Sequence, residues 1–118
     1  MIFVSLTIEE QRMCKKTIIA QREGVAITQC VNCKTVNIWK TGLLMRFTFD
    51  QFDQFAAITN RIEFDNYVEY APDGTEIVIL STPCNDICLM FTRVELDNFA
   101  SAIEEAIYMQ NIYKLVHN

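Results

Sequence analysis

The sequence contains little glycine and proline, and it has no glycine-rich segment. Three glycines and two prolines among 118 residues, with a hydrophobic share of 51%, exclude a flexible linker or a disordered chain and predict a folded globule. Three scattered glycines also cannot form a glycine-rich phosphate-binding loop. The length suits a single domain, residues 1–118, that buries a sizeable core.

Histidine is nearly absent. The one histidine, His117, stands next to the last residue of the sequence, where chains usually fray. A histidine-based catalytic triad or general base is therefore disfavoured. The carboxylates fall on the polar faces of predicted helices, where they are solvated. We therefore expect a protein that is not an enzyme.

Long apolar runs are also absent. No run approaches the roughly 20 residues that span a bilayer. The first ten residues lack a basic segment and include Glu9 and Glu10, which is not typical of a secretory signal peptide. We expect a cytoplasmic protein, and in that compartment disulfides are disfavoured.

One twelve-residue pattern occurs twice, at residues 45–56 and 89–100. Each copy has an apolar strand, then threonine followed three residues later by Gln or Glu, then an amphipathic helix. The threonine motif is a capping box, in which the threonine hydroxyl and the longer side chain satisfy amides of the first helical turn. The identical positions are Phe47/Phe91, Thr48/Thr92, Asp53/Asp97, Phe55/Phe99 and Ala56/Ala100.

Strand-like segments precede each copy. The first half has four, at residues 16–21, 24–30, 34–40 and 43–47, and the second half has three, at residues 67–70, 75–80 and 87–91. The sequence therefore predicts an α+β fold of order ββββα–βββα, an antiparallel sheet with two helices. Its duplicated βββα units are residues 24–62 and 67–109, related by a pseudo-two-fold axis. A short helix over residues 8–13 is also predicted. Whether one sheet continues through both halves is left open.

The charge is divided between two parts of the chain. The net charge of −5 combines +4 in residues 1–47, from seven Lys/Arg and three acids, with −9 in residues 48–118, from three Lys/Arg and twelve acids. Ordinary solvated faces are one interpretation. The other is a basic sheet that binds single-stranded nucleic acid through residues 16–47, with Lys34, Trp39, Lys40 and Arg46 as binding residues. The overall acidity disfavours strong phosphate binding.

Five cysteines form the only concentration of reactive side chains. Cys30 and Cys33 make a C-x-x-C motif at a turn between strands, a typical place for one half of a zinc site. Pairing Gln21 with Gly24 in the preceding hairpin puts Cys14 beside Cys30. Cys14, Cys30 and Cys33 are therefore candidate zinc ligands.

The fourth zinc ligand is open between His117 and an external group, and Cys84 with Cys88 offers a different completion. The alternative is that the cysteines are plain reduced thiols, some of them buried as small hydrophobic residues. A thioredoxin-like role is disfavoured, because that motif begins a helix and this one precedes a strand.

Residues 14–62 resemble a family of small uncharacterised bacterial proteins. The resemblance lies in the C-x-x-C motif, the strand at residues 36–39, the turn at Gly42 and the helix containing Phe52 and Phe55. It implies no catalytic residues, because that family has no assigned activity. In topology alone, the duplicated strand-rich unit with a helix is similar to Whirly and PUR-type proteins, which bind single-stranded nucleic acid on basic and aromatic sheet faces.

These observations favour a non-enzymatic binding or protein-interaction module. It would self-associate or dock a protein partner through a sheet face or through residues 112–116. A single-stranded nucleic-acid-binding domain and a zinc-stabilised small domain are the alternatives, and zinc is the only cofactor considered.

Overall fold

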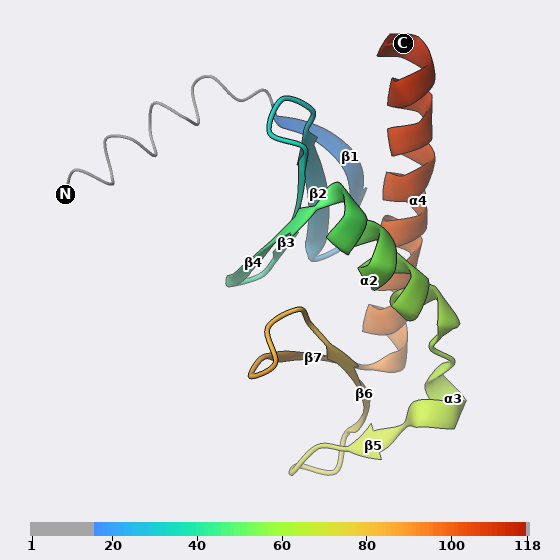
Figure 1. The fold of residues 1–118 in the computed structure, drawn as a ribbon. Coiled ribbons are helices and arrows are strands. Elements are labelled where there is room, and N and C mark those ends of the chain that lie inside the picture. The colour runs from blue at the N-terminus through green and yellow to red at the C-terminus, as the bar shows by residue number, and fades with distance from the viewer. Residues whose placement is uncertain (1–15, 118) are drawn as a thin grey trace, which may run out of the picture.

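Two antiparallel sheets and two long helices form the computed structural model, which describes residues 16–117 (Figure 1). The first sheet has the order β1 (Lys16–Arg22), β2 (Val25–Cys30), β3 (Thr35–Lys40) and β4 (Leu43–Thr48). The second has the order β5 (Glu69–Tyr70), β6 (Glu76–Ser81) and β7 (Cys88–Phe91). The helices are α2 (Phe49–Arg61), the short α3 (Phe64–Tyr67) and α4 (Arg93–His117). The predicted α+β class and strand–helix order are confirmed.

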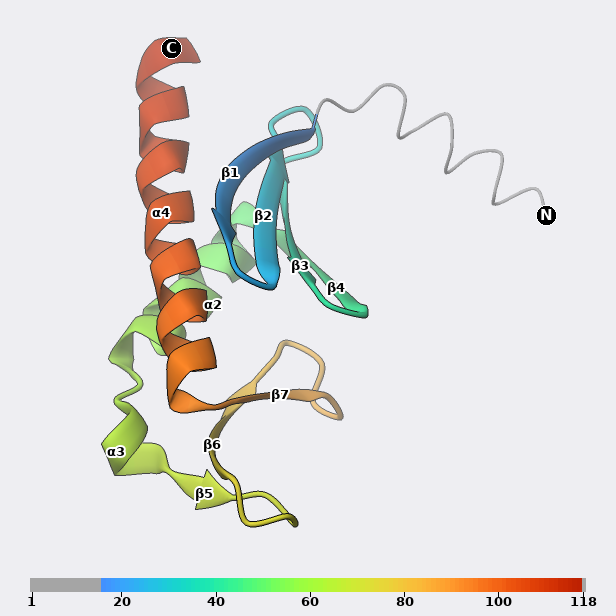
Figure 2. The same ribbon diagram turned by 180° about the vertical axis from the view of Figure 1, so that it is seen from behind.

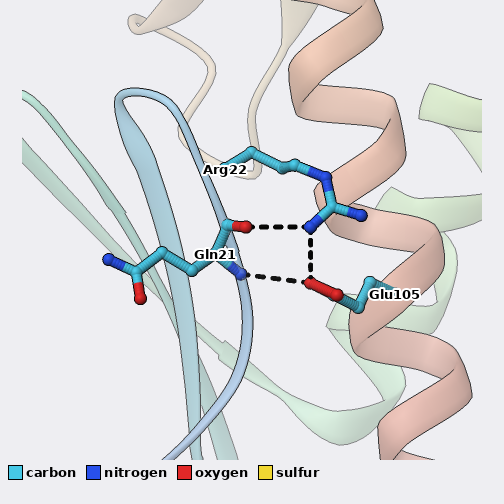
Figure 3. Close-up of polar contacts among 3 residues, drawn as sticks. All are labelled: Gln21, Arg22 and Glu105. Atoms are coloured by element: carbon cyan, nitrogen blue, oxygen red, sulfur yellow. Dashed lines mark hydrogen bonds and ion pairs between the residues drawn. The ribbon is translucent and has the colours of Figure 1, made fainter.

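The strands of the two halves form separate sheets, and α4 joins them. This helix follows β7 directly and continues along β1 and β2, as Figure 2 shows from behind. Glu105 of α4 accepts hydrogen bonds at Oε1 from the backbone N–H of Gln21, at 3.2 Å, and from Nη1 of Arg22, at 2.9 Å (Figure 3). The helix of the second half therefore packs on the sheet of the first.

Both long helices begin with the predicted capping boxes. In α2, the Thr48 N–H donates to Oε1 of Gln51 at 2.9 Å, and the Gln51 N–H donates to Oγ1 of Thr48 at 3.1 Å. In α4, the same two bonds join Thr92 and Glu95 at 2.9 and 3.4 Å. The boxes satisfy amides that a helix N-terminus otherwise leaves unpaired.

The repeat is preserved in the core. Phe47 of β4 and Phe55 of α2 have ring centroids 5.0 Å apart at 32°. Their counterparts Phe91 and Phe99 lie 4.7 Å apart at 33°. Phe55 and Phe99 then meet edge to face, with centroids 6.1 Å apart at 83°. One buried cluster thus contains the equivalent aromatic pair of each half, in contact with the other.

The β1–β2 hairpin differs from the sequence prediction. Gln21 pairs with Ala26, so Gly24 lies in the turn itself, with φ at 77°. The predicted pairing of Gln21 with Gly24 is wrong, because a left-handed backbone is easy for glycine and suits a turn better than a strand. A bulge in β1 shifts the register again and places Lys16 opposite Cys30.

The predicted helix over residues 8–13 lies outside the described residues. Among residues 16–117, no helix is both long and apolar enough to cross a membrane. Residues 112–116, whose role the sequence left open, continue α4. There Tyr113 packs against the core, whereas Leu115 and Val116 are exposed.

Candidate functional site

The face of the first sheet that points away from the core carries a polar and aromatic surface, here called the outer face. One row crosses all four strands in register and consists of Ile18, Thr28, Asn37 and Arg46. In the neighbouring row, Trp39 of β3 lies beside Leu44 of β4. Because side chains alternate along strands, these residues all point to the side opposite Val36 and Ile38 of the core.

The outer face unites only part of the predicted nucleic-acid-binding set. Trp39 and Arg46 share it. Lys40 points to the other side of the sheet, where its Nζ lies 5.5 Å from the ring centroid of Phe91. Lys34 lies in the turn between β2 and β3 and has a left-handed backbone, with φ at 56°.

Lys16 is a member of this surface that sequence reasoning missed. Its Nζ lies 5.7 Å from the ring centroid of Trp39, within the range of a cation–π contact. The indole N–H of Trp39 donates to Oγ1 of Thr28 at 3.0 Å, which fixes the orientation of the ring. Trp39 remains 39% exposed. The strands β1 to β4 contain no aspartate or glutamate, so the outer face is basic.

Asn37, at the centre of the outer face, has an unusual environment. The residue is only 3% exposed, and its Oδ1 atom is buried without a hydrogen-bond partner in the structure. A buried carbonyl oxygen without a donor is unfavourable, and native proteins contain few of them.

The C-x-x-C turn contains one backbone hydrogen bond to sulfur and one to a carbonyl oxygen. The Cys33 N–H donates to Sγ of Cys30 at 3.4 Å, and the Lys34 N–H donates to the carbonyl oxygen of Val31 at 3.3 Å. Cys30 is buried and Cys33 is exposed. Lys34, directly after this motif, has a left-handed backbone, a conformation that is easier for glycine.

The zinc prediction remains a prediction. Cys14, its third ligand, lies outside the described residues. Among residues 16–117, no three His, Cys, Asp or Glu side chains are placed to hold a metal ion. The alternative completion, Cys84 with Cys88, lies at the β6–β7 connection of the second sheet, and both residues are exposed.

The second sheet also has an outer face, and it is apolar and acidic. Ile79 of β6 lies opposite Met90 of β7, and they are 42% and 57% exposed. By strand alternation Glu69 belongs to this side, because it pairs with Ile77, two residues before Ile79. Sequence reasoning missed this surface, although strand alternation sets Ile79 apart from the buried Val78 and Leu80.

Comparison with known proteins gives no assignment. No family model, no curated protein and no solved structure matches the chain.

Proposed function

We propose that the chain is a non-enzymatic interaction module that self-associates. In the proposed contact, the outer face of the first sheet in one copy packs against the outer face of the second sheet in another copy. The observation that carries this proposal is the opposite character of these two exposed faces.

The charges support the pairing. The outer face of the first sheet places Lys16 and Arg46 around the exposed side chains of Trp39, Ile18 and Leu44. On the outer face of the second sheet, the acid Glu69 shares a side with an apolar centre formed by Ile79 and Met90. An apolar centre with a charged rim of complementary sign is the usual composition of a specific protein interface.

The proposal also accounts for the exposed apolar side chains. A cross-strand pair of Ile79 and Met90 that stays exposed is unfavourable unless another surface covers it. If both faces of one copy engage the same second copy, the contact occurs twice about a two-fold axis, which gives a closed dimer.

Sedimentation of the purified chain tests the proposal. We expect a dimer at high protein concentration and low salt, with dissociation as salt rises, because the rim contacts are ionic. Met90→Lys places a charge in the apolar centre and should give a monomer. The matched control is Ile58→Lys, since Ile58 is an exposed apolar residue of α2 that belongs to neither face.

Charge reversal identifies the two faces. Arg46→Glu alone and Glu69→Lys alone should each weaken self-association. An equimolar mixture of the two variants should associate more strongly than either variant by itself, because the reversed faces are again complementary. A chain that stays monomeric up to about 1 mM, where even a binding free energy of about −4 kcal/mol is detected, would refute the proposal.

Single-stranded nucleic-acid binding is the second candidate, and the fixed, partly exposed Trp39 ring beside Lys16 favours it. Trp39 is the single tryptophan of the sequence, so stacking of a base on it should quench the intrinsic fluorescence. Binding through Lys16 and Arg46 should weaken steeply as salt rises. If short oligonucleotides leave the fluorescence unchanged at low salt, this candidate is excluded.

A further inference from the structure

A cavity lies where the first sheet, the start of α2 and the C-terminal part of α4 meet. Its volume is about 260 Å³, and it lies beside Gln29, Phe49, Asp53, Ile107, Asn111 and Lys114. The first of these residues belongs to β2, the next two to α2 and the last three to α4. The cavity is separate from the two outer faces, because it lies on the side of the first sheet that the helices cover.

Gln29 is a polar residue that lines this cavity. The residue pairs with Val36 in the sheet, so its side chain points to the core side with that of Val36. Only 3% of Gln29 is exposed, and the residue lines the cavity. A side-chain amide at the wall of a cavity can donate and accept hydrogen bonds with a ligand.

Two opposite charges line the same cavity without pairing. Asp53 comes from the second turn of α2, and Lys114 comes from the last turns of α4. Neither forms an ion pair within residues 16–117, where the described pairs are Arg22–Glu105 and Arg93–Asp65. The apolar side chains of Phe49 and Ile107 line the cavity with them.

We propose that this cavity binds a free α-amino acid with an apolar side chain. The ammonium group of the ligand would meet Asp53, its carboxylate would meet Lys114, and its side chain would lie on Phe49 and Ile107. The Gln29 amide would then hydrogen-bond the ligand. The volume supports a ligand of this size, because it is below the roughly 300 Å³ at which pockets for drug-sized molecules begin.

Calorimetric titration of the full chain with leucine and phenylalanine tests the proposal. We expect binding of both, and weaker binding of N-acetyl-leucine, which lacks the ammonium, and of leucinamide, which lacks the carboxylate. Removing either charge should weaken binding by about tenfold, because the ligand then loses one charge-assisted hydrogen bond to the cavity.

Variants assign each charge to its partner. Asp53→Asn should weaken leucine binding about tenfold and leave the affinity for N-acetyl-leucine unchanged, whereas Lys114→Gln should weaken leucine binding and leave leucinamide unchanged. The matched control is Asp97→Asn, the equivalent position of the second repeat, which does not line this cavity. Both aspartates are exposed, so neither change should prevent folding.

Three results would overturn the proposal. The first is that no apolar amino acid binds at about 10 mM, a concentration above the Kd of a specific ligand. The second is equal binding of leucine and N-acetyl-leucine, which would remove the role of Asp53. The third is an equal effect of Asp97→Asn and Asp53→Asn. Self-association is measured separately, so its failure would not affect this result.

Discussion

Asn37 and Thr28 face each other across β2 and β3, yet their hydrogen bonding differs. The Thr28 hydroxyl accepts the indole N–H of Trp39, whereas Oδ1 of Asn37 has no donor in the structure. A satisfied buried polar group contributes to stability, and an unsatisfied one detracts from it. Substitutions at the two residues therefore compare a satisfied with an unsatisfied buried polar group on one face of the sheet.

We predict that Asn37→Val stabilises the fold by about 1 kcal/mol, because it removes an unsatisfied amide oxygen and introduces a residue that favours strands. Thr28→Val should destabilise it by about 1 kcal/mol, because the indole N–H loses its acceptor. Urea unfolding of the two variants measures both changes. If Asn37→Val is as destabilising as Thr28→Val, the Asn37 amide has a partner in solution.

The two cysteines of the C-x-x-C turn differ in burial, and this separates the zinc and thiol interpretations. If the cysteines are plain thiols, Cys30→Ala should lower stability by about 1 kcal/mol, because Cys30 is 1% exposed. Cys33→Ala should change stability by less than about 0.5 kcal/mol, because Cys33 is exposed.

Thermal unfolding with and without a chelator completes this test. The thiol interpretation predicts the same melting temperature in both cases and no zinc in the purified protein. If both substitutions are equally costly and the chelator lowers the melting temperature, the cysteines hold a structural zinc ion.

The two capping boxes offer a comparison at the level of the element, because one is neutral and the other is charged. Gln51 closes the box of α2, and Glu95 closes that of α4. The hydrogen bond from the Thr92 backbone N–H lowers the pKa of Glu95 below its usual 4.5. A carboxylate with a lowered folded-state pKa stabilises the fold above its unfolded-state pKa, and that contribution disappears as the pH falls through the folded value.

We therefore predict that Glu95→Gln makes α4 resemble α2. The substitution should keep the box, so that stability at pH 7 changes little, and it should make stability less dependent on pH between about 5 and 3. Hydrogen bonds from Thr75 lower the pKa of Asp73 as well, so that carboxylate also contributes to the pH dependence of stability. The measurement is therefore the difference between the urea midpoints of the wild type and the variant at each pH.

Thr92→Ala is the companion variant for this test. It should lower stability by about 1 kcal/mol near neutral pH, because the Glu95 amide loses its acceptor. A Glu95→Gln variant with the same pH dependence as the wild type would show that the box bond does not affect the ionisation of Glu95.

The elements could be predicted from the sequence because their signals are local. Each capping box spans four residues, and the apolar spacing of the helices and strands repeats over short distances. The register of β1 with β2 could not be predicted, because it depends on which residues form the turn and on a bulge, and Gly24 was compatible with the strand end or the turn.

At the scale of the whole molecule, the sites depend on contacts between distant segments. Lys16 lies over Trp39, and the cavity brings Gln29 together with Asp53 and Lys114. The sequence carries the residue types and the division of charge, but no local pattern shows that α4 crosses to the first sheet. That crossing places Glu105 against β1, and it creates the cavity.

The same crossing predicts that the two halves unfold together. Phe55 of the first half meets Phe99 of the second inside one core, so loss of one half removes contacts from the other. We expect coincident urea transitions when unfolding is followed by Trp39 fluorescence, which reports on the first sheet, and by far-ultraviolet circular dichroism, which reports on the helices.

A double-mutant cycle tests whether the contact between Phe55 and Phe99 couples the stability of the two halves. Phe55→Leu with Phe99→Leu should show an interaction energy of about 0.5–1.5 kcal/mol, because the edge-to-face contact is lost by either change. Phe47→Leu with Phe91→Leu is the control, since each of these rings contacts an aromatic partner within its own half. Additive effects at Phe55 and Phe99, or two separate transitions, would mean that the repeats are stabilised independently. In that case α4 would be a connector between two units instead of part of a shared core.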